Sequence, residues 1–353
     1  MKILGRKSYT VVLVSMFITL ILAIMITSNI GSASISTYDV FRIISSKIPY
    51  IGRTIDIGDI TLGQHTIIWN VRLPRVILGA LVGASLAISG ASFQGLLKNP
   101  MADPFILGIS SGAALGASIA IITKVTFSFF GFSFVSITAF IGALLAVFTV
   151  YNIGRIKNKV PVTTLLLAGV AVGQFLTAIM SFLMVIYNKD MTKIIYWTLG
   201  SLAGKGWTPI TTLGVPLTIT MIILTFFAKD LNVMLTGEES AKSLGINVER
   251  TKIYILILGT FLTSLSVSVS GIIGFVGLII PHIVRLITGP DHRILLPASA
   301  FAGGTFMIIA DTIARTAISP MEVPVGIITA LFGGPFFIYL LRLKKKSIRG
   351  WLL

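Results

Sequence analysis

Residues 76–97 read VILGALVGASLAISGASFQGLL, and this stretch contains no charged side chain. A helix that crosses a bilayer needs about 20 consecutive, predominantly apolar residues. Gly79, Gly83 and Ala87 recur within the stretch at four-residue spacing, which places small residues on one helix face, as in membrane helices whose backbones approach closely. The stretch therefore predicts a transmembrane helix that packs tightly against a neighbour.

The composition extends this pattern to the whole chain. Of 353 residues, 55% are hydrophobic and 11% are charged, and the mean hydropathy is +0.96. A soluble domain carries about 25% charged residues, so a soluble enzyme and a disordered chain are both excluded. We predict an all-α, polytopic membrane protein, with a single transmembrane domain over 1–353 and about ten transmembrane helices near 9–30, 75–97, 105–123, 133–154, 162–187, 209–228, 252–271, 275–288, 294–315 and 324–342.

The distribution of basic residues predicts the topology. An even number of spans places both termini on one side, and 18 of the 28 Lys and Arg residues then fall on that side. Because cytoplasmic loops carry the excess of positive charge, both termini are predicted to be cytoplasmic, in a plasma or inner membrane. The net charge of +16 is scattered between apolar stretches, which argues against a nucleic-acid-binding face.

The residue patterns of several chemical functions are absent from the sequence. The segment most similar to a nucleotide-binding loop, residues 200–206 (GSLAGKG), has the wrong glycine spacing and lacks the Ser or Thr that would bind magnesium. The chain has no cysteine, and His65, His282 and His292 are scattered over both predicted sides of the membrane. We therefore predict no metal site, no catalytic residues and no nucleotide bound by this chain.

Few ionisable residues fall inside the predicted spans, where such residues would mark an ion or proton relay. Asp311 and Arg315 lie four residues apart and are expected to neutralise each other on one helix. His282 and Arg285 lie near the cytoplasmic end of a span, where long side chains can reach the interface. No titrating relay is predicted from these four residues.

Six further motifs occur in a fixed order. They are RLPR (72–75) followed by GALVGASLAISGASFQGLLKNPMADPFILGISSGAALGA (79–117), then GEESAKSLGI (237–246), GIIGFVGLIIPHIVRL (271–286), DHRILLP (291–297), Asp311 with Arg315, and EVPVGIITALFGGPFF (322–337). Over about residues 35–342 the chain resembles the permease subunits of ATP-binding-cassette (ABC) importers for iron–siderophore complexes, haem and cobalamin (FecCD-type), and is similar to the cobalamin importer permease.

This resemblance implies a subunit composition and a source of energy. Such permeases have ten spans per subunit and form a homodimer around a central path. Two ATPase subunits bind on the cytoplasmic side, and an extracytoplasmic substrate-binding protein docks on the other. ATP and magnesium bind the partner ATPase, so no cofactor is expected in this chain. The resemblance leaves open which chelate is transported, and whether the chain pairs with itself or with a paralogue.

The cytoplasmic segment 229–252 resembles the part of these permeases that contacts the ATPase. Thr236 and Glu239 have the spacing of a capping box, and Gly245 suits a helix C′ position, so a short helix is expected from about Glu238 to Leu244. A solvated loop is the alternative. The resemblance implies ATPase coupling by Gly237, Glu238, Glu239, Ser240, Ala241, Lys242, Ser243, Leu244 and Gly245.

Three arginines on the predicted outer side resemble the docking residues of this family. The resemblance implies that Arg72, Arg75 and Arg315 pair with glutamates of the binding protein, for which a planar guanidinium is well suited. The alternative is that Arg72 and Arg75 contact lipid headgroups while Asp311 holds Arg315.

The resemblance also implies a cytoplasmic gate formed by Asn99 and Met101 in one loop and by Val162 and Thr163 at the start of a span. An apolar constriction contributed by both copies could close the path. The cobalamin member has polar residues at the second pair, so Val162 departs from it and predicts a more hydrophobic gate. An ordinary loop is the alternative.

Two other classes of function remain as alternatives. A secondary, ion-coupled transporter with inverted repeats would need an ion or proton site near the middle of the membrane. An intramembrane enzyme would need a nucleophile and a base within reach of each other. Neither constellation is recognisable in the sequence, so a transport subunit driven by partner ATPases is the preferred interpretation.

Overall fold

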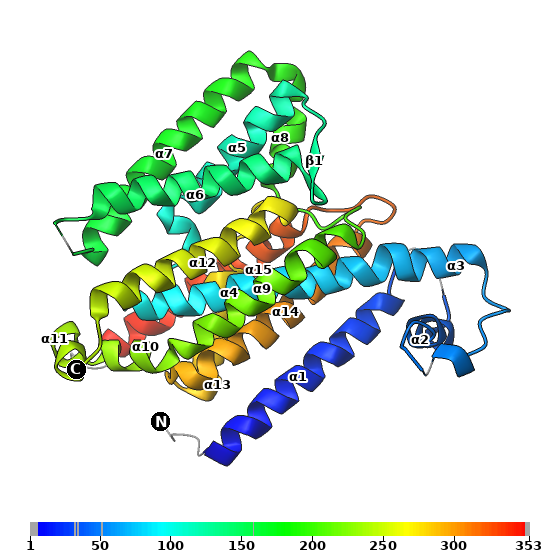
Figure 1. Cartoon of the computed structure of the whole chain (residues 1–353), viewed down its shortest axis with the longest axis horizontal. Coiled ribbons are helices and arrows are strands. Elements are labelled where there is room, and N and C mark those ends of the chain that lie inside the picture. The colour runs from blue at the N-terminus through cyan, green and yellow to red at the C-terminus, as the bar shows by residue number, and fades with distance from the viewer. Residues whose placement is uncertain (1–5, 32, 34, 51, 158, 350–353) are drawn as a thin grey trace.

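The computed structural model describes residues 6–31, 33, 35–50, 52–157 and 159–349 of the chain (Figure 1). Within this part, seven helical units are long and apolar enough to cross a membrane, and three apolar helices are shorter. The long units are α1 (Arg6–Asn29), α3 to α4 (Leu62–Leu96), α6 (Phe134–Gly154), α7 (Val162–Ile186), α9 (Thr208–Phe226), α12 (Val248–Ser270) and α14 (His292–Thr316). The shorter ones are α5 (Ile109–Thr123), α13 (Val276–Thr288) and the apolar part, Val325–Tyr339, of α15, which continues as a helix to Arg349.

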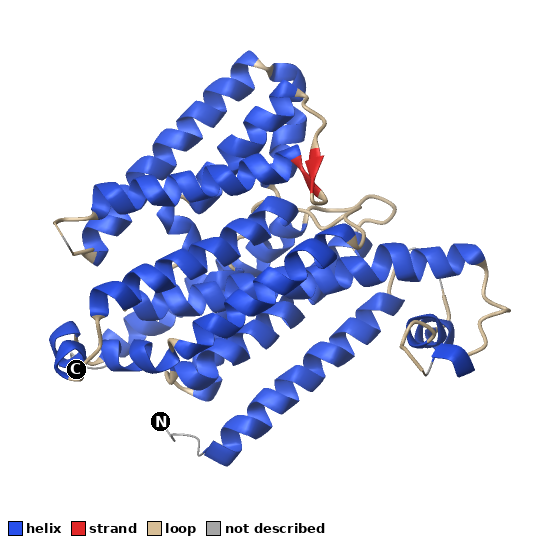
Figure 2. Ribbon diagram, viewed as in Figure 1, coloured by secondary structure: helices blue, strands red, loops and turns tan. Residues whose placement is uncertain are grey.

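Short elements connect these helices. Four are α-helices: α2 (Thr37–Ser45), α8 (Met191–Thr198), α10 (Ala228–Leu235) and α11 (Glu238–Ser243). Three are single 3₁₀ turns: η1 (Gly52–Thr54), η3 (Pro104–Leu107) and η4 (Asn188–Asp190). In the described residues the only strands are β1 (Ser128–Phe129) and β2 (Phe132–Ser133), which form a small antiparallel hairpin (Figure 2). The predicted all-α membrane fold with about ten transmembrane helices is confirmed.

Helix α4 lies in the middle of the bundle, packed against α14, α12 and α13. A Cβ atom on Gly83 would lie 2.3 Å from the carbonyl oxygen of Gly303 on α14, and one on Gly90 would lie 1.9 Å from the carbonyl oxygen of Gly277 on α13. Real side chains cannot approach a backbone so closely, so these glycines allow the helix axes to come together. The small residues that the sequence places on one face therefore form the packing face of the central helix.

Helices α5, α6 and α7 form a second group, which lies along one side of the bundle, whereas α1 lies along the opposite side (Figure 1). Helices α5 and α6 are in backbone contact, because a Cβ on Gly112 would lie 2.3 Å from the carbonyl oxygen of Gly142. Helix α7 is more peripheral, with only 11% of its most apolar segment buried. The side of the molecule that carries α7 therefore leaves a large apolar helix surface uncovered by this chain.

The central helix is longer than the predicted span. Residues Leu62–Leu96 form one helical unit of 35 residues, about 52 Å at 1.5 Å per residue, whereas the hydrocarbon core of a bilayer is about 30 Å thick. The first part is α3 (Leu62–Thr66), followed by a π-helical turn, η2 (Ile67–Arg72). The sequence prediction began the span at residue 75 because the charge of Arg72 and the proline at position 74 interrupt the apolar pattern.

The two ends of the bundle differ in their short elements (Figure 1). Helices α2 and α3 lie at one end, here called the α2 end. The beginning of α1, the end of α15, and helices α10 and α11 lie at the other, here called the α11 end. The residues singled out by the sequence fall at these two ends.

Candidate functional sites at the two ends of the bundle

A buried ionic cluster occupies the α2 end, where α4 begins. Arg75 Nε and Nη2 donate to the two carboxylate oxygens of Asp311 on α14 at 2.8 and 2.9 Å, and Nη1 donates to Glu322 at 2.8 and 2.9 Å. The side chains of Arg75 and Asp311 are 8% and 3% exposed, whereas that of Glu322 is 43% exposed. The guanidinium of Arg75 is thus held by two carboxylates of its own chain, in the paired geometry that Arg and carboxylates prefer.

The other two candidate arginines bind the end of α1. Arg72 Nη1 donates to the carbonyl oxygen of Asn29 at 2.8 Å, and Arg315 Nη2 donates to the carbonyl oxygen of Thr27 at 2.5 Å. The last carbonyl groups of a helix lack intrahelical partners, and cations near this terminus also interact favourably with the helix dipole. Both arginines are buried. Their hydrogen bonds connect the end of α1 to the start of α4 and to α14.

These contacts correct one expectation from the sequence. Asp311 was expected to pair with Arg315, four residues away on the same helix. It pairs instead with Arg75, which is 236 residues away in sequence, because the close packing of α4 on α14 brings Arg75 opposite Asp311. The structure brings all three arginines to the same end of the bundle, but each is buried in the isolated chain, and Glu322 is the exposed member of the cluster.

Helix α11 lies at the opposite end. Its C-terminus has the hydrogen bonds of a Schellman motif: the N–H of Gly245 donates to Lys242 O at 2.9 Å and that of Ile246 donates to Ala241 O at 3.0 Å. Gly245 has φ +86°, as expected for a C′ glycine. Ala241 is fully buried, whereas Leu244 is 71% exposed. The short helix predicted from the sequence is present, and it presents an exposed leucine.

The predicted capping box at the start of α11 is wrong. The N-cap is Gly237, with no side-chain cap hydrogen bond. The hydroxyl group of Thr236 instead donates to the carbonyl oxygen of Val233 in the last turn of α10. Thr236 therefore ends α10 rather than beginning α11, a role that the spacing of Thr236 and Glu239 did not reveal.

The predicted gate residues lie in two segments near α7. Asn99 and Asp103 each accept a hydrogen bond from the backbone two residues on, from Met101 N–H at 2.9 Å and Phe105 N–H at 2.8 Å. Such Asx turns fix a loop without regular secondary structure. Val162 and Thr163 begin α7, Thr163 being exposed and Val162 half-buried. The segment that follows Asp103, η3, contacts α7: a Cβ on Gly169 would lie 2.2 Å from Ile106 O.

Asp103 was not singled out from the sequence. Burial raises the pKa of its carboxyl group to about 6, although the hydrogen bond from Phe105 N–H acts in the opposite direction. Ionisation of Asp103 is therefore costly. Because Asp103 lies in the same loop as Met101, we add it to the candidate gate site. The signal available in the sequence was an Asp-Pro pair placed four residues after an Asn-Pro pair between two apolar stretches.

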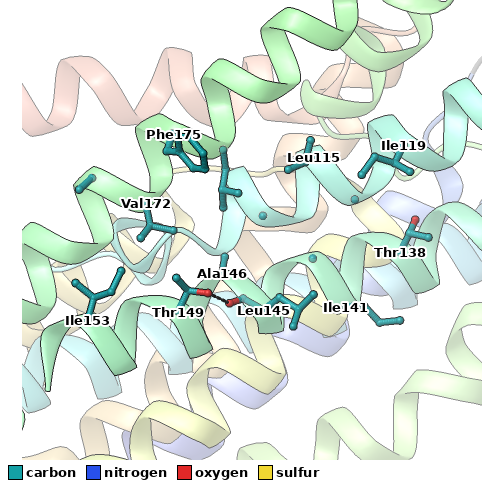
Figure 3. Close-up of a pocket in the computed structure, with 15 residues that line it drawn as sticks. Leu115, Ile119, Thr138, Ile141, Leu145, Ala146, Thr149, Ile153, Val172 and Phe175 are labelled. Carbon is teal, nitrogen blue, oxygen red and sulfur yellow. Dashed lines mark hydrogen bonds between the residues drawn. The ribbon is translucent and has the colours of Figure 1, made fainter.

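A groove of about 720 Å³ lies between α5, α6 and α7, lined by residues such as Leu115, Ile141 and Phe175 (Figure 3). The hydroxyl groups of Thr138 and Thr149 in its wall donate to carbonyl oxygens within α6. The lining therefore offers an apolar surface without convergent polar groups. It lacks the few orienting polar groups typical of a small-molecule site.

Comparisons with known proteins are consistent with this architecture. Residues 18–343 match the model of the FecCD transport family. The chain is 50% identical over 278 residues to the cobalamin import system permease protein BtuC of Halobacterium salinarum, covering 79% of this chain and 74% of that protein. It is 38% identical over 286 residues to the hemin transport system permease protein HmuU of Yersinia pestis, covering 80% and 85%.

A solved structure has the same fold. An inward-facing metal-chelate type ABC transporter superposes with a TM-score of 0.79 at 29% identity, covering 95% of this chain and 99% of that chain. The family match spans nearly the whole set of helices described above. This chain therefore belongs to the FecCD transport family, and it is a membrane-spanning permease subunit of an ABC importer rather than an enzyme.

Proposed function

We propose that two copies of this chain form the path for a bulky metal chelate, imported across the cell membrane. The observation that carries this proposal is the 50% identity to a permease named for cobalamin. A second relative is named for hemin. A corrinoid and a porphyrin are both large, flat metal chelates, so the proposed substrate is a chelate of this size, a siderophore–iron complex included.

The uncovered face of α7 supports a dimer with a central path. Gln174, Ala178 and Ser181 follow one another at helical spacing, and all three are exposed in the single chain. Polar groups inside a bilayer normally face a protein interior or a water-filled cavity rather than lipid. A second copy packed near this face would place Gln174 and Ser181 in a polar path between the two chains.

Energy enters this system at the α11 end, which faces the cytoplasm in the proposed orientation. The beginning of α1 and the end of α15 lie at this end as well, in agreement with the excess of Lys and Arg expected there. The exposed Leu244 on a rigid, Schellman-capped helix suits a groove on an ATPase subunit. ATP and magnesium bind that partner, and α11 with its flanking residues, 237–245, receives the movement of the ATPase.

The α2 end receives the substrate-binding protein in this proposal, with Arg72, Arg75 and Arg315 as the docking charges. The cluster holds three arginines and two acids, Asp311 and Glu322, and therefore has one excess positive charge. This excess favours docking of an acidic protein surface. Glu322 covers Arg75 from the solvent side. A carboxylate of the binding protein would replace Glu322 on Arg75, while Asp311 keeps its own bidentate contact.

The gate lies at the cytoplasmic side of the path in this proposal. Met101 and Val162 provide apolar groups, and the turns at Asn99 and Asp103 hold the first of them in a fixed loop. With one such pair from each copy, closure needs only dewetting of a narrow apolar ring. Cysteines at Met101 are expected to crosslink across the dimer and to block uptake.

Uptake into proteoliposomes tests this function. The chain is reconstituted with its ATPase and binding protein, and accumulation of labelled cobalamin, hemin and a ferric siderophore is measured with ATP inside, with and without an uncoupler. We expect one chelate to accumulate with ATP and to be unaffected by the uncoupler. Uptake that persists without ATP and collapses with the uncoupler would instead support an ion-coupled transporter.

A further inference from the structure

A buried lysine links the proposed coupling helix to the neighbouring transmembrane helix. Lys252, one turn into α12, has a side chain that is only 6% exposed. Its ammonium group lies 2.8 Å from Glu238 Oε1, at the first residue of α11, and 3.4 Å from Glu249 Oε1, one turn earlier on α12. Lys252 therefore joins an acidic side chain on each of the two helices.

The second carboxylate oxygen of Glu249 continues the connection to a third segment. The backbone N–H of Val160 donates to Glu249 Oε2 at 3.1 Å. Val160 is buried and immediately precedes Pro161, the N-cap of α7. An unbroken series of polar contacts thus runs from α11 through Lys252 and Glu249 to the residue that leads into α7, where the proposed gate residues begin.

Burial makes these contacts costly to break. An ammonium group that loses its acidic partners in a buried site suffers an uncompensated desolvation cost. An unpaired buried backbone N–H adds a further, smaller penalty. A displacement of α11 therefore carries Lys252 and Glu249 with it more readily than it separates them, and Val160 follows.

The charge state of Glu238 is consistent with a persistent contact. Although partial burial raises the pKa of this carboxyl group, its hydrogen bond to Lys252 and the positive charges of Lys252, Lys98 and Lys242 lower the pKa below its ordinary value overall. The carboxylate is therefore ionised at neutral pH, as its pairing with Lys252 requires.

We infer that Lys252 is a positioning residue that transmits movement of α11, through Glu249 and Val160, to the start of α7 and hence to the gate. This inference rests on the proposed function, in which α11 meets the ATPase and Val162 and Thr163 form part of the gate. It adds a specific polar linkage to that function. Loss of the linkage uncouples ATP hydrolysis from transport without preventing assembly with the ATPase.

The test compares three variants in the full complex with ATPase and binding protein. Lys252→Met removes the charge and keeps the length of the side chain, and Lys252→Arg keeps the charge. Lys189→Met makes the same change as Lys252→Met at an exposed lysine of η4, outside segment 229–252. We expect Lys252→Met to lower the chelate imported per ATP hydrolysed by about tenfold, within the usual range of coupling between sites. Lys252→Arg and Lys189→Met are expected to stay close to the parent chain.

A second readout follows the gate itself. Because the chain has no cysteine, Thr163→Cys supplies a single thiol at an exposed position at the start of α7. Its rate of modification by a maleimide is expected to depend on nucleotide in the parent and in Lys252→Arg, and to become independent of nucleotide in Lys252→Met. A purely structural role for Lys252 would not produce this pattern in a complex that still hydrolyses ATP.

Variants at the two acids keep the inference testable if Lys252→Met does not fold. Glu238→Gln, at a side chain that is 38% exposed, is expected to lower coupling in the same direction by a smaller factor. Glu249→Gln retains an acceptor for Val160 N–H, whereas Glu249→Leu does not, so the second should uncouple more strongly. Parent-like import per ATP and nucleotide-dependent labelling in Lys252→Met and Glu238→Gln would overturn the inference, whereas absence of ATP-driven uptake in the parent complex would overturn the proposed function.

Discussion

The two ends of this permease use charge in opposite ways. At the α2 end, Arg75 is held by Asp311 and Glu322 of its own chain, and the cluster is largely closed. At the α11 end, the buried charge of Lys252 is internal, but the helix that it anchors presents an uncovered leucine at Leu244. If the partners bind as proposed, docking at the α2 end exchanges one ion pair for another, whereas binding at the α11 end only has to cover apolar surface.

Breaking the buried pair at the α2 end should have the largest effect on stability. Asp311→Asn leaves the guanidinium of Arg75 without its bidentate partner, and loss of one member of a buried pair typically costs about 3–5 kcal/mol. Thermal unfolding of the detergent-solubilised chain measures this cost. The matched change Glu322→Gln, at an exposed partner of the same arginine, should cost at most about 1 kcal/mol. Equal destabilisation by both variants would contradict the different burial of the two acids.

Placing a charge at the α11 end should weaken assembly with the ATPase rather than lower the stability of the chain. Leu244→Asp places a charge in the surface proposed to enter the ATPase groove, and a truncated or charged hot-spot residue commonly costs 2 kcal/mol or more of binding, roughly 30-fold in affinity. Pull-down of the ATPase with the reconstituted chain measures this loss. Leu62→Asp, at an 82% exposed leucine of the α2 end, is the control and should leave ATPase binding unchanged. Parent-like ATPase binding by Leu244→Asp would separate α11 from the interface.

At the α11 end, Asp103 in the loop that carries Met101 predicts that the stability of the chain depends on pH. Because burial raises the pKa of Asp103 to about 6, its neutral form favours the folded state; this contribution is fully present below the ordinary pKa of about 3.9 and is lost as the pH rises through about 6. Asp103→Asn keeps an acceptor for Phe105 N–H and should stabilise the chain by ~1–2 kcal/mol at pH 7.5, with less gain at pH 4.5. Unfolding curves at the two pH values check this sign; a destabilised Asn variant at pH 7.5 would contradict it.

The smallest expected effect concerns the proposed replacement of Glu322 by another carboxylate at the α2 end. If a carboxylate of the binding protein replaces Glu322 on Arg75, Glu322→Gln removes the competitor and should tighten docking by about two- to fivefold, most clearly at low salt, where exposed charges are least screened. Affinity for the binding protein is measured in nanodiscs at two ionic strengths. Weaker docking by Glu322→Gln would show that Glu322 contributes directly to the interface. Charge reversal at Arg75 is a poorer test, because it would also place a carboxylate against Asp311.

Much of the fold could be predicted from the sequence, because a bilayer imposes a simple requirement on each span. Charge-free stretches such as 76–97 identify helices directly, and the four-residue spacing of Gly79 and Gly83 indicates the packing face. The extension of the central helix back to Leu62 could not be predicted in this way, since its polar residues lie beyond the apolar core and helix formation there follows from the adjoining span.

The candidate sites were less predictable, because they depend on contacts between distant segments. Proximity along one helix suggested that Asp311 holds Arg315, but the approach of α4 to α14 places Arg75 against Asp311 instead. The end of α11 was predictable because Gly245 acts through local backbone geometry alone. The links from Lys252 to Glu238 and from Glu249 to Val160 required the positions of three separate segments, which no local pattern contains.

Replacement of α11 tests the central claim most directly, namely that this permease supplies a path and receives its energy from a partner at the α11 end. Residues 238–243 are exchanged for a Gly/Ser linker of equal length, and chelate uptake and ATP hydrolysis are measured in the same proteoliposomes with ATPase and binding protein present. The account predicts that uptake falls to background, whereas binding-protein docking at the α2 end remains. ATP-driven uptake at the parent rate without α11, or ATP hydrolysis by the purified chain alone, would contradict it.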